Sequence, residues 1–237
     1  MRAEIEHTRA DTTQRTYARL AGFLFLAVII VALGSGFVLS SVAGRGTFVE
    51  VARRVTASER LYRVALSTGV LASVSSVLLA FALYVTLKTV DNLLAQLALI
   101  FSVGDAFLGL VVRVCGFATL RLYVSAQGVV SGPNTAQALS DLMRGIAAIT
   151  ENIGGISFGI GLLLFFYLFF RSRYIPRILA ALGLVASAIW IALYSASLAF
   201  PELRGLVLYV CFPAMGLADV GTGFYLMLWG LPDRSTR

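Results

Sequence analysis

The stretch 101-FSVGDAFLGLVVRVCGF-117 is apolar almost throughout, yet it contains Asp105 and Arg113. It lies in an apolar run from about Leu93 to Leu120, and about 20 such residues span the hydrocarbon core of a bilayer as a helix. Charged side chains inside a membrane normally face other helices and have partners there. The stretch therefore predicts a membrane-spanning helix that is packed within a bundle.

The composition extends this prediction to the whole chain. Of its 237 residues, 59% are hydrophobic and 13% are charged, against about 45–50% and about 25% in soluble domains. No polar linker divides the sequence, which favours one compact bundle. The net charge is +7, but the arginines lie between apolar runs. This arrangement favours contact with the lipid bilayer over nucleic-acid binding.

Five further apolar runs are long enough to span a membrane. They cover about 20–41, 56–87, 144–170, 178–200 and 206–231. The sequence therefore predicts an all-α integral membrane bundle of six transmembrane helices at 20–231. A polar and mostly disordered N-terminal tail at 1–19, whose end could extend the first helix, and a polar C-terminal tail at 232–237 would flank it.

The segment between the first two spans contains two capping-box patterns, Thr47 with Glu50 and Thr56 with Glu59. In this motif the threonine side chain accepts from the backbone three residues on, and the glutamate reaches back. We expect a short amphipathic helix from Thr47 and the second span from Thr56. In the fourth span, Gly155 and Gly159 form a G-x-x-x-G pair that favours close approach of another helix.

An even number of spans places both termini on one side of the membrane. The basic loop at 170–177 and the basic flank of the first span predict that this side is the cytoplasmic face of the cell membrane.

The sequence lacks the catalytic residues that several classes of enzyme need. The single histidine is His7, in the polar N-terminal segment, which disfavours histidine-dependent nucleophiles, zinc sites and axial-histidine haem. Cys115 and Cys211 fall inside apolar runs and are interpreted as small hydrophobes. The sequence predicts no cofactor and no metal site, and it argues against an enzyme.

Four segments carry a family resemblance: RTYARLAGFLFL at the first helix, FALYV at 81–85, RSRYIPRILAALG at 171–183 and CFPAMGLADVGTGFYLMLWGL at 211–231. Together they resemble the bacterial six-helix membrane family catalogued as domain of unknown function 4386, from about Arg15 to Leu231. The resemblance implies the six-helix fold and supplies no mechanism. It also implies acidic residues in helices three and six, where Asp105 and Asp219 stand.

Arg113 and Glu151 are predicted to lie at similar depths. Each lies two turns or so from the outer end of its helix, and the third and fourth helices are consecutive and antiparallel, so the two side chains can meet, with Asn152 adjacent. One interpretation is a structural ion pair between two helices. The others are a polar pocket open to the outer face, and an Arg113 side chain that extends to the lipid headgroups.

Asp105 and Asp219 are both predicted near the middle of the membrane, with no cation at their depth. We expect Asp105 to face the sixth helix. Each carboxyl could be protonated and hydrogen-bonded to a neighbouring helix. Alternatively, the two could form a proton or ligand site on a transport path.

Three functions follow from these residues. The first is a small proton-linked carrier or membrane ligand-binding protein for an unidentified small molecule or ion. The second is a membrane scaffold or accessory subunit, which would bind a membrane-protein partner or form a homo-oligomer through small-residue stripes. The third is an intramembrane enzyme that uses carboxylates as acid and base.

Overall fold

The computed structural model describes residues 2–125, 133–203, 205, 209–210 and 212–230, with side chains from Gln14 onward. These residues form α-helices and no strand, which confirms the all-α prediction. The helices are α1 (Arg2–Ala43), α2 (Phe48–Ala57), α3 (Glu59–Leu87), α4 (Asn92–Ser125), α5 (Pro133–Ser172), α6 (Arg177–Ala199) and α8 (Phe212–Leu228), with a 3-10 helix η1 (Pro201–Leu203).

Five of the described helices are long and apolar enough to cross a membrane: α1, α3, α4, α5 and α6. The sixth predicted span corresponds to α8, whose 17 residues fall short of the roughly 20 that cross the hydrocarbon core. The predicted span began at 206, and residues 206–208 and 211 lie outside the described part. The predicted count of six is therefore met approximately.

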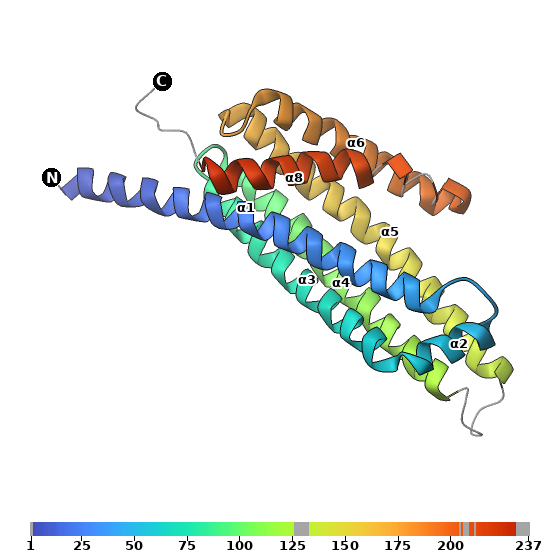
Figure 1. The fold of residues 1–237 in the computed structure, drawn as a ribbon. Helices are drawn as coiled ribbons and strands as arrows, with labels where there is room; N and C mark the ends of the chain where they lie inside the picture. The colour runs from blue at the N-terminus through green and yellow to red at the C-terminus, as the bar shows by residue number, and fades with distance from the viewer. Residues whose placement is uncertain (1, 126–132, 204, 206–208, 211, 231–237) are drawn as a thin grey trace.

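The long helices close into a ring. α1 packs against α3, α3 against α4, α4 against α5, α5 against α6, α6 against α8, and α8 against α1. Figure 1 shows the start of α1 and the end of α8 at one end of the bundle, with α2 at the opposite end. The two ends are called the terminal end and the α2 end below.

Two helix starts differ from the predictions. α1 begins at Arg2, so helix rather than disorder continues through the polar residues before Leu20. Gln14 explains part of this, because it is buried and its Nε2 donates to the Thr86 carbonyl at 2.6 Å and to Thr89 Oγ1 at 3.0 Å. These bonds tie the polar part of α1 to the end of α3.

The capping box at Thr47 is confirmed, and it starts α2 at Phe48. The second capping box was wrong, because α2 continues through Thr56 to Ala57 and α3 begins at Glu59. Glu59 pairs instead with Arg63 one turn later, at 2.6 Å. A capping pattern thus fails when the preceding helix already includes its threonine.

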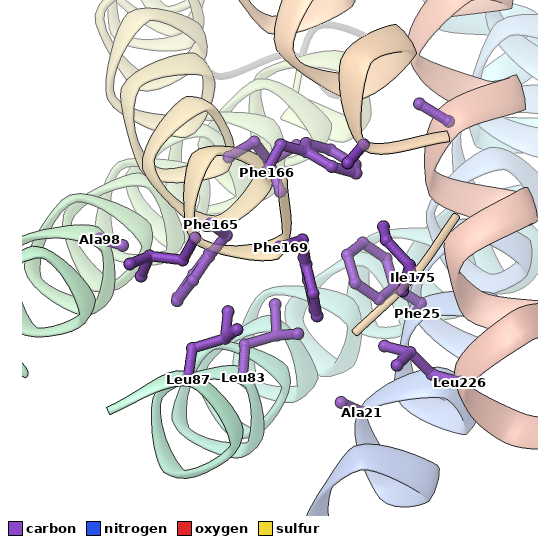
Figure 2. Packing of buried hydrophobic residues seen from close by; sticks show 14 of the residues in the cluster. Ala21, Phe25, Leu83, Leu87, Ala98, Phe165, Phe166, Phe169, Ile175 and Leu226 are labelled. Atoms are coloured by element: carbon purple, nitrogen blue, oxygen red, sulfur yellow. The ribbon is translucent and has the colours of Figure 1, made fainter. Parts of the chain in front are cut away.

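The hydrophobic core lies mainly toward the terminal end and is built around aromatic residues of α5. Phe165, Phe166 and Phe169 are each 1% exposed. Figure 2 shows them gathered among side chains from α1, α3, α4 and α8. Aromatic side chains of this size dominate the packing energy of a core. A second, smaller cluster joins α2 to α3 and α4 at the other end.

The predicted glycine pair is the seam between α5 and α6. A Cβ on Gly155 would lie 2.3 Å from the ring of Tyr194, and one on Gly159 would lie 2.6 Å from Ile191. Trp190 stacks on Tyr194 at 5.0 Å between ring centroids and donates to the Gly155 carbonyl at 3.0 Å. The absence of side chains at the two glycines lets the α6 rings pack directly on the α5 backbone.

Gly155→Ala should therefore destabilise the protein by about 1–3 kcal/mol, the usual cost of an overpacked core. Gly145 on the same helix has nothing within 4 Å of an added Cβ, so Gly145→Ala is a matched control. We expect the control to be neutral or slightly stabilising, because alanine favours a helix over glycine. Thermal unfolding in detergent compares the two, and equal melting temperatures would contradict this account of the seam.

Candidate functional site

A cavity of about 440 Å³ opens at the α2 end of the bundle. Its wall combines the end of α1 with parts of α2, α3, α4 and α5. Apolar side chains cover much of the wall. The polar side chains of the wall are those of Arg45, Tyr62, Arg113, Thr119, Tyr123 and Arg144.

The loop at 44–46 forms one edge of the cavity and is held in a fixed shape. Gly44 and Gly46 have φ values of 61° and 151°, which favour glycine. Arg54 of α2 donates to the Ala43 carbonyl at 2.8 and 3.1 Å, and to the Arg45 carbonyl at 3.0 Å. These bonds fasten α2 to the end of α1.

Arg113 enters the cavity from α4, inside a membrane-spanning helix. Its side chain lies across Gly69 of α3, where an added Cβ would be 2.6 Å from the Arg113 Nε. Within the described residues, this buried Nε has no hydrogen-bond partner. Such an unsatisfied buried donor is costly, and in native structures it often marks a functional group or an unplaced ligand or water.

Glu151 and Asn152, the predicted partners of Arg113, are both residues of α5. The carboxylate of Glu151 is close enough for the two opposite charges to attract. Glu151 is exposed, whereas Asn152 beside it is buried. The structural ion pair between the two helices stays a prediction. A role for this polar pair in function stays a prediction.

Arg144 adds a second cation, at the mouth of the cavity. It forms an ion pair with Asp141 one turn earlier on α5, and both side chains are about half exposed. The Arg144 charge also acts on the hydroxyl groups of Tyr62 and Tyr123. Two hydroxyls and a guanidinium group therefore face one another across α3, α4 and α5.

Asp105 lies deeper on α4 than Arg113, by eight residues or about 12 Å. It faces α5, because an added Cβ on Gly154 would be 3.2 Å from its Oδ1. The expectation that Asp105 faces the sixth helix was therefore wrong. α4 packs between α3 and α5, so α8 is not its neighbour in the ring.

Asp219 lies on the inner face of α8 and is 5% exposed. Its Oδ1 has no hydrogen-bond partner among the described residues, and neither has the Oγ1 of Thr222 one turn later. α8 packs against α1 and α6, whereas Asp105 lies in the α4–α5 interface. The two candidate acids thus have separate surroundings. Their proposed role as a proton or ligand site stays a prediction.

The sequence reasoning missed the cavity residues Tyr62, Tyr123, Arg45 and Arg144 as site residues, and it also missed Gly69, which makes room for the Arg113 side chain. Arg45 and Arg144 were interpreted only as charges that set the topology. The signal that could have found them is position, since arginines and tyrosines occur at the ends of the first four spans on one side. Gly69 gave no signal, because glycine is common in membrane helices.

The ring of long apolar helices defines a multi-pass helical membrane protein. The chain belongs to the family described as Domain of unknown function (DUF4386), whose family model matches residues 20–230. This match confirms the resemblance found in the sequence. No curated protein and no solved structure matches the chain.

Asp219 allows a direct test of whether a buried carboxyl serves packing or is kept for another reason. We expect Asp219→Asn to raise the melting temperature at pH 8, because a neutral amide costs less to bury than an ionised carboxylate. A gain of about 1 kcal/mol corresponds to a rise of roughly 2–4 °C for a chain of this size. Unfolding curves from pH 5 to 8 measure it.

If Asp219→Asn is more stable than the parent, the Asp219 carboxyl lowers the free energy of unfolding of the parent and is retained for function. A variant less stable than the parent at every pH would instead make Asp219 a structural contact between helices.

Proposed function

We propose that this chain is a carrier-type ligand-binding membrane protein, which takes up a small ligand at the α2 end of its helical bundle. The observation that supports the proposal is the cavity of about 440 Å³, which is lined in part by Arg113 of a membrane-spanning helix. Ligand sites in proteins are commonly cavities of about 300–1,000 Å³ with mostly apolar walls and a few polar groups. This cavity fits both criteria.

Polar groups extend from the cavity toward the middle of the bundle. Glu151 interacts with Arg113 at the cavity, and Gly154, less than one turn deeper on α5, contacts Asp105. The α4–α5 interface thus contains ionisable groups at two depths. This arrangement favours proton-linked ligand binding, in which a proton on Asp105 and ligand at Arg113 influence each other through the same pair of helices.

The proposal includes an orientation in the cell membrane. The basic loop between α5 and α6 lies at the terminal end, together with the start of α1. Basic loops are retained in the cytoplasm. We therefore place the terminal end in the cytoplasm and the cavity on the outer face.

The positions of the three acids give little support to the hypothesis of an acid–base enzyme. Asp105 and Asp219 lie in different helix interfaces, and Glu151 lies exposed near Arg113. A pair of carboxylates in one cleft would favour such a reaction. Asp105 and Glu151 both approach the α4–α5 interface, but neither lines the cavity.

Cys115 provides a test, because its thiol is a free, buried group on the cavity wall. In a Cys211→Ser background, a membrane-impermeant thiol reagent added outside the cell should label Cys115. Ala147 also lines the cavity, so Ala147→Phe should reduce the labelling rate severalfold by filling the space. Labelling of intact and opened cells, followed by mass spectrometry, measures both effects.

The control is Ile146→Phe, at the preceding and exposed position of α5. It should leave labelling unchanged. Labelling only after the cells are opened would reverse the orientation, and equal labelling in both phenylalanine variants would argue against the cavity as the entry site.

A second candidate function is supported by an open surface on α1. Gly36 has nothing within 4 Å of an added Cβ, and it is exposed together with Ser40 one turn later on the same face. Small residues on a membrane helix allow another helix to approach closely. A scaffold or accessory subunit that contacts a partner, or a second copy, through α1 would use this surface.

For this second candidate we expect Gly36→Leu to abolish self-association, because a leucine side chain would block the close approach of two α1 helices. Chemical cross-linking in membranes, combined with mass determination in detergent, measures the oligomeric state. A parent protein that is monomeric in both assays would argue against self-association through α1.

A further inference from the structure

We infer that the cavity at the α2 end binds the phosphate group of an anionic amphiphile. This inference rests on the proposed function, since it identifies the chemical class of the ligand for the same site. Charge, hydrogen-bond donors and the apolar part of the wall support it separately.

The charge of the wall is positive. Arg45, Arg113 and Arg144 all line the cavity, and no carboxylate is among its described lining residues. Three carboxylates lie nearby: Asp141 pairs with Arg144, Glu151 attracts Arg113, and Glu50 caps α2 beside Gly46. Arg54 lies against the same glycine, so four guanidinium groups against three neighbouring acids leave a net positive charge for an anion to neutralise.

The donors fit an oxyanion. A guanidinium group presents several N–H groups in a planar fork that matches the oxygens of phosphate or carboxylate. The Nε of Arg113 is buried against Gly69 and donates to no described group, so only the two terminal nitrogens of this guanidinium group can reach a ligand in the cavity. The hydroxyls of Tyr62 and Tyr123 line the same space near Arg144. Thr119, in contrast, already donates to the Cys115 carbonyl at 2.9 Å.

The rest of the wall is apolar. Leu39 of α1, Val51 of α2 and Leu66 of α3 all line the cavity. A bare inorganic anion would leave these side chains without contacts, whereas an amphiphile would place its apolar part against them. The level in the membrane also fits, because Arg45 and Arg144 line the cavity near the ends of the spans, where lipid phosphate groups are found.

Phosphate of this kind could come from an anionic lipid or from a soluble phosphate compound. The experiment uses the purified full chain in dodecyl maltoside micelles. Phosphatidylglycerol and phosphatidylcholine with identical acyl chains are added separately, and inorganic phosphate is compared with chloride at equal ionic strength. The shift in melting temperature over each titration gives an apparent dissociation constant.

We expect phosphatidylglycerol to raise the melting temperature more than phosphatidylcholine does. Arg113→Gln and Arg144→Gln should each weaken its binding by about tenfold or more, because each removes charge-assisted hydrogen bonds. Arg144 is 53% exposed, so its variant tests the inference even where Arg113→Gln fails to fold. Arg53→Gln is the matched control, since Arg53 is exposed on α2 outside the cavity.

If inorganic phosphate gives the same arginine-dependent shift, the site takes a soluble phosphate compound. If neither phosphate source binds more tightly than its control, or if Arg53→Gln weakens binding as much as Arg144→Gln, the inference is overturned.

Thiol labelling of Cys115 separates this failure from failure of the proposed function. A cavity that is labelled, and blocked by Ala147→Phe, but not protected by phosphatidylglycerol would remain a ligand site of another class.

Discussion

A guanidinium group on a membrane-spanning helix limits which residues can surround it. A charge inside a bilayer is costly, by at least about 2.5–3.5 kcal/mol at the centre, unless it faces other helices and has polar partners there. Arg113 meets this constraint inside the bundle. Gly69 on α3 provides room for its side chain, Glu151 on α5 provides the opposite charge, and the cavity keeps part of its surroundings polar. The packing of α3, α4 and α5 at the α2 end therefore depends on one buried cation.

Closure of the ring depends on a different constraint, which is close approach of backbones. At the α1–α8 seam, an added Cβ on Gly22 would lie 2.6 Å from the Gly223 carbonyl oxygen. At the α5–α6 seam, Gly155 and Gly159 accept the rings and side chains of α6. Van der Waals packing of this kind is the main attraction between helices in a membrane, where lipid tails are as apolar as the side chains.

The sequence predicted what depends on composition and on local patterns. Helix type and the approximate number of spans follow from long apolar runs, and the start of α2 follows from the capping box at Thr47. Depth alone does not specify which way a side chain points around its helix. For this reason Asp105 was assigned to the wrong neighbour, and Tyr62, Tyr123 and Arg144 were not recognised as parts of one cavity.

The two ends of the bundle differ, and the difference bears on mechanism. At the terminal end, Phe165 and Phe169 fill the centre, and Gln14 ties α1 to α3 by hydrogen bonds. At the α2 end, the helices enclose open space lined by arginines. Because protein interiors are dense, tightly packed aromatic side chains change between discrete arrangements rather than continuously. A carrier would have to separate the phenylalanines of α5 from α1 and α3 to release its ligand at the terminal end. A protein that only binds its ligand would leave them in place, so the mobility of the Phe165–Phe169 core distinguishes the two mechanisms.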